Sequence, residues 1–167
     1  TMTDRRTALV VGASGGIGLA IARQLLQEPG IQRVYATYRQ PNNATALLAI
    51  DDDRLRTLKV DITSADDLQS LAANIRADQS HPDFVINCAG LLHEDALQPE
   101  KSLNQCKQDA LTRLFQVNSI APLMLARAIL PLMPKNRAGH FAVLSAMVGS
   151  IGDNRLGGWY GYRASKA

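Results

Sequence analysis

A tyrosine and a lysine near the end of the sequence have the types and spacing of a proton-transfer pair. The stretch WYGYRASKA, residues 159–167, contains Tyr160, Tyr162 and Lys166. Tyr162 and Lys166 are four residues apart, so on a helix their side chains share one face, whereas the residue four after Tyr160 is Ala164. A nearby ammonium favours the phenolate form of a tyrosine. We therefore expect Tyr162 to act as a general acid and base tuned by Lys166; the alternative is an ordinary pair on a solvent-exposed helix face.

A glycine-rich segment near the start of the sequence could hold phosphates. VGASGGIG, residues 11–18, follows an apolar run, opens a helical pattern and has the spacing G-x-x-x-G-x-G. Glycines let the backbone turn sharply and approach a pyrophosphate, and the helix N-terminus offers free N–H groups to it. No Gly-Lys-Ser/Thr follows, so a P-loop is not indicated. The segment predicts dinucleotide binding, the alternative being a turn chosen for geometry alone; its residues of interest are Gly12, Ser14, Gly15, Gly16 and Gly18.

The end of the second apolar run indicates which dinucleotide binds. An acidic residue about 20 positions beyond the glycines would bind the ribose 2′-hydroxyl of NAD, but the sequence ATYRQ places Arg39 there. A guanidinium pairs with a 2′-phosphate, which a carboxylate would repel. No acidic residue occurs between Glu28 and Asp51. NADP(H) is therefore predicted, the alternative being an exposed arginine. Asp61, after the third run, is placed equally for the adenine amino group or for a turn before the next helix.

The elements that must position these residues alternate along the chain. Short β-branched or apolar runs predict strands, and between them apolar residues recur with helical spacing. Ser64, followed three residues later by Asp67, predicts the start of one helix. Right-handed crossovers between parallel strands place helices on both faces of the sheet. We expect an α/β fold, a doubly wound parallel Rossmann sheet in a single domain over 1–167, with strands at 7–11, 33–38, 55–60, 83–87 and 140–145 and helices at about 16–27, 43–50, 65–79 and 107–133.

Composition excludes several classes of partner. The net charge of +3 comes from 18 basic and 15 acidic residues that interleave along the chain, whereas nucleic-acid binders usually gather their basic residues. No apolar run approaches the ~18 residues that span a bilayer, and the start lacks a signal-peptide cleavage site. We expect a cytoplasmic protein with no nucleic-acid or membrane partner. Cys88 and Cys106, 18 residues apart, favour reduced thiols over a disulfide or metal site.

Taken together and in this order, five motifs resemble the short-chain dehydrogenase/reductase family: GASGGIG (12–18), VDI (60–62), NCAG (87–90), VN (117–118) and YRASK (162–166). The resemblance covers essentially all 167 residues. The run GSIGDNRLGGWYGYRASKA is most similar to NADPH-dependent carbonyl reductases of the C-factor and sniffer type. One departure is Val11, where the family often has threonine.

The resemblance implies an activity and a set of site residues. It implies hydride transfer between NADPH and a small carbonyl or alcohol substrate, in a homodimer or homotetramer. Small residues after the fourth strand would let the backbone run beside the cofactor ribose, and Asn87 would tie neighbouring strands together. The implied catalytic residues are Asn118, Ser145, Tyr162 and Lys166. The implied cofactor-binding residues are Gly12, Ser14, Gly15, Gly16, Ile17, Gly18, Arg39, Asp61, Ile62, Asn87, Ala89, Gly90, Tyr162 and Lys166.

Two of these catalytic positions leave alternatives open. The family places a serine after the fifth strand, where we predict Ser145; alignment on Gly149 would place Ala146 there instead, and Ser150 is a third choice. Asn118 precedes Pro122 by four residues, and proline has no N–H, so the Asn118 carbonyl loses its helical partner. A water could link this carbonyl to Lys166; the alternative is a simple proline kink.

Two other functions fit the same residues. One is a non-catalytic NADP-binding regulator, because a fold does not fix a function. The other is a sugar-nucleotide epimerase, whose usual G-x-x-G-x-x-G spacing Gly12, Gly15 and Gly18 also fit. The family has sixth and seventh strands. We therefore expect the sheet to be truncated after the fifth strand and the start of the helix with Tyr162, with the substrate-binding part absent from this sequence.

Overall fold

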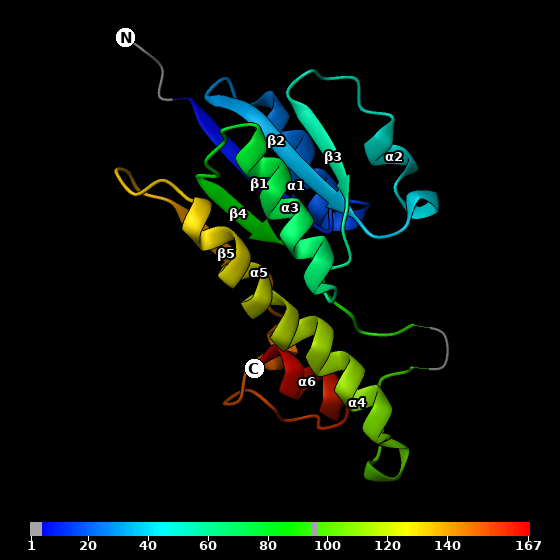
Figure 1. Cartoon of the computed structure of the whole chain (residues 1–167). Coiled ribbons are helices and arrows are strands. Elements are labelled where there is room, and N and C mark those ends of the chain that lie inside the picture. Colours follow the sequence, from blue (N-terminus) through cyan, green and yellow to red (C-terminus); the bar gives the residue numbers. More distant parts are fainter. Residues whose placement is uncertain (1–4, 95–96) are drawn as a thin grey trace.

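The computed structural model of the chain describes residues 5–94 and 97–167, and its centre is a sheet of five parallel strands (Figure 1). Their order is β3-β2-β1-β4-β5, so the chain changes direction between β1 and β4. Doubly wound sheets bind their ligands at this change of direction. The predicted fold class is confirmed. The strands are β1 (Arg6–Val11), β2 (Ile31–Tyr38), β3 (Leu55–Lys59), β4 (Phe84–Asn87) and β5 (His140–Val143).

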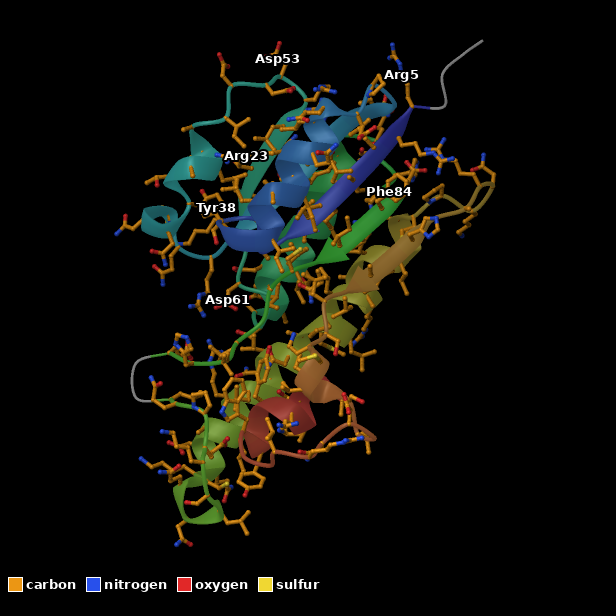
Figure 2. The ribbon with its side chains drawn as sticks, turned by 180° about the vertical axis from the view of Figure 1, so that it is seen from behind. Arg5, Arg23, Tyr38, Asp53, Asp61 and Phe84 are labelled. Atoms are coloured by element: carbon orange, nitrogen blue, oxygen red, sulfur yellow. The ribbon has the colours of Figure 1, made fainter. Side chains whose placement is uncertain are left out.

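Helices cover both faces of the sheet, as the two opposite views show (Figures 1 and 2). α1 (Gly16–Gln27) and α2 (Thr45–Leu48) pack on one face; α3 (Ala65–Ala77) and α5 (Ala121–Ile129) pack on the other. α4 (Gln108–Phe115) precedes α5, and α6 (Tyr160–Lys166) packs beside α4 beyond the carboxyl ends of the strands. The short helical turns are Pro41–Asn43, Leu103–Gln105, Leu130–Leu132 and Met147–Gly149.

The alternation of side chains in β1 explains why the sheet has two apolar faces. Val10 packs in the cluster formed with α1, whereas Leu9 and Val11 pack in the cluster formed with α3 and α5. Successive side chains of a strand point to opposite faces, so a strand buried on both sides is apolar throughout. All three side chains are fully buried. The first strand is thus fixed at the centre of the sheet, and the glycine loop leaves from its end.

The long helix predicted at 107–133 is continuous but contains a π-helical turn. Gln116–Ile120 forms this turn between α4 and α5, and the Ala121 N–H donates to the Gln116 carbonyl, five residues back. Pro122 in the first turn of α5 has no N–H for the Asn118 carbonyl, which favours such a change of pitch. The predicted capping residue is confirmed at α3, where the Ser64 hydroxyl accepts a hydrogen bond from the Asp67 N–H at 3.2 Å.

The helical run Gln108–Leu132 passes a membrane-span test by length and composition. About a third of its most apolar 18-residue stretch is buried inside the fold. Val117, Ala121, Leu125 and Ile129 lie on its buried side, in the same cluster as residues of the sheet and α3. This packing accounts for the apolar residues on the buried side of the run.

Candidate active site

A cavity of about 270 Å³ lies at the carboxyl ends of the strands, beside the change of direction between β1 and β4. In Figure 2, Asp61 and Tyr38 mark this end of the sheet, and Arg5 marks the opposite end. The structure brings together residues from five separate segments of the chain here. The predicted cofactor-binding residues that line the cavity are Gly12, Ser14, Arg39, Asp61, Ile62, Ala89 and Gly90; the others are Val11, Thr37, Val60, Thr63, Cys88, Leu91, Arg113 and Val117.

The glycine loop is held tightly against the ends of β2 and β4. Gly12 has a φ of +78°, and a Cβ there would lie 2.7 Å from the Ala89 nitrogen, so only glycine fits. A Cβ on Gly18 would overlap the Gly12 carbonyl. The Gly12 N–H donates to the Thr37 hydroxyl at 3.1 Å, and the Ala13 N–H donates to the Thr37 carbonyl at 2.7 Å. These contacts fix where the loop passes over the sheet.

The other glycines of the loop face open space in front of α1. A Cβ on Gly15 or Gly16 would meet no atom within 4 Å. Gly15 is the N-cap of α1 and gives the first turn no side-chain cap, and Ile17 in that turn is 63% exposed. A helix N-terminus with uncapped N–H groups and open space before it binds a diphosphate well. The residues present therefore fit the diphosphate of a dinucleotide cofactor.

Asp61 forms the turn before α3, which is one of the two roles that the sequence suggested for it. Its Oδ1 accepts hydrogen bonds from the Thr63 N–H at 2.9 Å and the Thr63 hydroxyl at 2.7 Å. Burial alone would raise the pKa of the Asp61 carboxyl, but the Thr63 hydrogen bonds and the charges of Arg39 and Arg113 outweigh it and hold that pKa below its ordinary value. Asp61 is thus ionised at the cavity wall, and its contact with adenine stays a prediction.

Asn87 and Cys88 end β4 beneath the cavity. The Asn87 side chain is fully buried; its Oδ1 accepts the Ala89 N–H at 3.1 Å, while its Nδ2 has no hydrogen-bond partner among the described residues. The backbone of Asn87 pairs with Val11 of β1 and Val143 of β5. Burial raises the pKa of the Cys88 thiol, which disfavours the thiolate and agrees with a packing role.

Asn118 fastens the loop after β4 to α6 through its side chain. Its Oδ1 accepts the Leu91 N–H at 2.8 Å, and its Nδ2 donates to the Leu91 carbonyl at 2.8 Å and to the Ser165 hydroxyl at 2.9 Å. The side chain is buried within the π-helical turn. Asn118 therefore joins three segments, a role that the sequence did not indicate, and its carbonyl remains the predicted water acceptor.

Lys166, at the end of α6, does not line the cavity but lies beside Gly90, which does. Its ammonium donates to the Leu144 carbonyl at 2.8 Å, and burial lowers the pKa of this lysine. A Cβ on Gly90 would lie 3.0 Å from the Lys166 Nζ and 3.5 Å from the Asn118 Oδ1. Gly90, Asn118 and Lys166 therefore lie side by side, and their shared role in one site stays a prediction.

Tyr162 lies on α6 one turn before Lys166, as the spacing predicted. Its ring is partly buried against the core cluster and meets the Trp159 ring edge-on, with centroids 6.3 Å apart. The start of α6 is anchored by Glu100, which is only 4% exposed: its carboxylate accepts the Gly161 N–H at 3.4 Å and its carbonyl accepts the Trp159 N–H at 2.6 Å. Glu100 thus positions the turn that carries Tyr162.

The three positions considered for the catalytic serine lie in one exposed stretch after β5. The Ser145 hydroxyl is exposed and donates to the Lys166 carbonyl at 2.8 Å. Ala146 is partly buried, and Ser150 is exposed after the helical turn Met147–Gly149. Of the two serines, Ser145 is the one that the structure joins to the Tyr162 helix by a hydrogen bond.

A family model described as short chain dehydrogenase matches residues 6–167, nearly the whole chain. The chain belongs to the short chain dehydrogenase family. Among curated relatives, the 1-hydroxy-2-glutathionyl-2-methyl-3-butene dehydrogenase of Rhodococcus sp. (strain AD45) is 30% identical over 161 residues, which are 96% of this chain and 65% of that protein. A 3-oxoacyl-acyl-carrier-protein reductase of Salmonella typhimurium is 28% identical over 98% of this chain and 63% of its own length.

Solved structures of short chain dehydrogenases share the fold. The carbonyl reductase Sniffer of D. melanogaster matches with a TM-score of 0.84 and 28% identity, over 97% of this chain and 70% of that one. The NADPH-bound carbonyl reductase from chicken fatty liver matches with a TM-score of 0.82 and 28% identity, over 97% of this chain and 66% of that one. The predicted resemblance to the family and to sniffer carbonyl reductases is confirmed. The chain spans less than two thirds of the length of the first curated relatives it matches.

Several residues of this short chain dehydrogenase site escaped the sequence analysis. Thr37 binds the glycine loop through both its hydroxyl and its carbonyl. Its place two residues before Arg39, on the predicted strand, is a signal that could have found it. Arg113 lies four residues before Val117 and so shares its helix face, but nothing local showed that this face borders the cavity. Glu94 and Glu100 lie in the connection between β4 and α4, where no regular pattern of apolar residues predicts an element.

Proposed function

We propose that this chain holds the cofactor-binding and catalytic residues of an NADPH-dependent oxidoreductase that interconverts a carbonyl and an alcohol. The observation that carries the proposal is the position of Gly90, which lines the cavity behind the glycine loop and also adjoins the Lys166 ammonium. Gly90 thereby links the wall of the cavity to the helix that carries Tyr162. Membership of the short chain dehydrogenase family supports hydride transfer as its chemistry.

NADP(H) is the cofactor that we propose, for two reasons. Arg39 lines the cavity at the end of β2, where a guanidinium can pair with the 2′-phosphate. The similar structures include a carbonyl reductase described as NADPH-bound and a Burkholderia multivorans protein described with bound NADP. Gly12, Gly15, Gly16 and Gly18 would hold the diphosphate at the N-terminus of α1.

Each proposed catalytic residue has its own role in the transfer of the hydride and the proton. A bound nicotinamide supplies or accepts the hydride at the substrate carbon. Tyr162 donates the proton that the carbonyl oxygen needs during reduction and removes it during oxidation. Lys166 would hold the nicotinamide ribose one helical turn after Tyr162. Ser145 binds the carbonyl oxygen once its hydroxyl turns from the Lys166 carbonyl, and the Asn118 carbonyl holds a water that passes protons to Lys166.

The partners that we propose follow from the family rather than from contacts in this chain. The substrate is a small carbonyl or alcohol, and the protein works in the cytoplasm as a homodimer or homotetramer. The two curated relatives are longer than this chain, which covers 65% and 63% of their lengths.

Consumption of NADPH tests the proposed function. Absorbance at 340 nm is followed with the whole protein, NADPH and a simple diketone or quinone. Steady consumption that depends on the carbonyl compound supports an oxidoreductase. Tight NADPH binding without turnover over a panel of carbonyls and alcohols would instead support a non-catalytic regulator.

A further inference from the structure

A carboxylate already lies between the two arginines of the cofactor cavity. Glu94 Oε1 accepts a hydrogen bond from Arg113 Nε at 2.9 Å, and Glu94 Oε2 lies 3.7 Å from Arg39 Nη1. Both arginines line the cavity, Arg39 from the end of β2 and Arg113 from α4. The cation proposed for the 2′-phosphate is therefore paired with an acid of the same chain.

The two ion pairs are unequal. The Arg113–Glu94 pair is a hydrogen bond of ordinary length, whereas the Arg39–Glu94 pair is close to the limit at which two charges count as paired. Arg39 is also the most exposed of the three side chains, at 48% against 28% for Arg113 and 31% for Glu94. A phosphate that enters the cavity would therefore detach Arg39 from Glu94 and leave Arg113 in place.

Among the described residues, the charges at this end of the cavity balance. Arg39 and Arg113 supply two positive charges, and Asp61 and Glu94 supply two negative ones. The hydrogen bond from Arg113 holds the pKa of the Glu94 carboxyl below its ordinary value, and the charge of Arg39 adds to this. Glu94 is thus ionised at neutral pH. A 2′-phosphate must compete with this carboxylate for Arg39 and is also repelled by it.

We propose that Glu94 sets the cofactor preference of the site by competing with the 2′-phosphate of NADPH for Arg39, while Arg113 anchors it in that position. The proposal rests on the proposed function, because it assumes that a nicotinamide dinucleotide binds in this cavity. NADH has a ribose hydroxyl in place of the phosphate, so the charge of Glu94 lowers its binding affinity only a little. Glu94 therefore makes the ratio of NADPH affinity to NADH affinity smaller than Arg39 alone would make it.

A purely structural role for Glu94 predicts a different result. The Glu94 N–H donates to the Leu97 carbonyl, and the Leu97 N–H donates to the Glu94 carbonyl. In a purely structural role, Glu94 would only hold the connection between β4 and α4 in place. Loss of such a support would change the affinities for NADPH and NADH together. The ratio of the two affinities separates the two roles, and neither measurement requires turnover.

The test is a pair of fluorescence titrations, with NADPH and with NADH, on the whole protein and on Glu94→Gln. Glutamine keeps the size and one acceptor of the side chain but removes its charge. We expect Glu94→Gln to bind NADPH about fivefold more tightly and NADH within about twofold of the unchanged protein, an effect of the size of a partly exposed ion pair. Glu28→Gln, with the same charge change at the far end of α1, should leave both affinities unchanged.

A second variant tests the anchor. Arg113→Gln frees Glu94 to pair fully with Arg39, so NADPH binding should weaken more than NADH binding, and this extra loss should shrink when Glu94→Gln is also present. An unchanged affinity ratio in Glu94→Gln, or equal weakening of both cofactors, would overturn the proposal while leaving the proposed function intact. An unchanged protein that binds neither cofactor would overturn the proposed function and this inference with it.

Discussion

The Lys166 ammonium donates a hydrogen bond to the Leu144 carbonyl at 2.8 Å, while the hydroxyl of the next residue, Ser145, donates to the Lys166 carbonyl at 2.8 Å. These two bonds run in opposite directions between the end of β5 and the last turn of α6. They bring two of the proposed catalytic residues together although 21 positions separate them in the chain. These two hydrogen bonds hold the end of α6 against the residues that follow β5. Substitutions at Lys166 therefore test both its role in the reaction and its contribution to stability.

Lys166→Met should remove activity while leaving the fold intact. Methionine keeps the unbranched stem of lysine but cannot hold the nicotinamide ribose. Because burial already disfavours the ammonium, loss of its hydrogen bond to Leu144 is offset by the removal of a buried charge. We expect the free energy of unfolding to change by less than about 1 kcal/mol in urea titrations. A larger loss of stability would show that Lys166 mainly supports the fold.

The difference in the free energy of unfolding between the unchanged protein and Lys166→Met should depend on pH. Burial places the pKa of Lys166 in the folded protein below the ordinary value of 10.5. Between these two values the unfolded chain binds more protons than the folded one, so the free energy of unfolding rises with pH in that window. Lys166→Met lacks this contribution. Any stability advantage of the variant at neutral pH should shrink as the pH approaches 10.5, and an advantage that grows with pH would contradict this account.

Gly15→Ala should weaken cofactor binding without unfolding the protein. Gly15 has a φ of −171°, which alanine adopts, and a Cβ there would meet no protein atom within 4 Å. The added methyl group would instead occupy the space proposed for the diphosphate. We expect at least about a tenfold loss of NADPH affinity by titration, the change that 1.4 kcal/mol produces, with an unchanged melting temperature.

Gly18→Ala is the matched control for that substitution. A Cβ on Gly18 would overlap the Gly12 carbonyl, so this alanine must displace the glycine loop itself. We expect a fall in stability of about 1–3 kcal/mol together with the loss of NADPH binding. If Gly15→Ala lowered the melting temperature as much as Gly18→Ala, the open space before α1 would not be the reason for glycine at position 15.

Glu100→Ala should disturb catalysis through the position of α6. The carboxylate accepts the Gly161 N–H at the start of the helix, and it does not line the cofactor cavity. We expect a loss of about 1–2 kcal/mol of stability and a lower kcat, with the NADPH dissociation constant unchanged. Glu100→Gln keeps an acceptor for that N–H and should restore most of the kcat. A variant that lost only cofactor affinity would place Glu100 in another role.

The parts of the site that depend on local pattern could be predicted from the sequence. The glycine loop, Arg39 at the end of β2, and Tyr162 one turn before Lys166 all follow from short stretches whose geometry is set within the stretch. The five strands follow from apolar runs for the same reason, although the predicted helix at 43–50 is only Thr45–Leu48 in the structure. A proline-containing turn precedes it at 41–43 and takes up part of that segment.

The contacts that close the site depend on how distant segments meet, and no local pattern encodes them. The Asn118 side chain binds Leu91 and Ser165, and Glu94 lies between Arg39 and Arg113. The contacts of Leu91 and Glu94 require the path of the irregular connection after β4, and the contact with Ser165 requires the position of α6. The direction of the Ser145 hydroxyl likewise follows from where α6 ends its last turn, which the sequence alone does not specify.

Turnover by Tyr162→Phe is the most direct test of the central claim, that Tyr162 is the acid and base of an NADPH-dependent reaction. Phenylalanine keeps the ring against Trp159 and the core but removes the hydroxyl. The account predicts NADPH affinity within about twofold of the unchanged protein, and a fall in kcat of about 10²-fold or more with a carbonyl substrate. Full reductase activity in Tyr162→Phe would contradict the assignment, whatever its effect on cofactor binding.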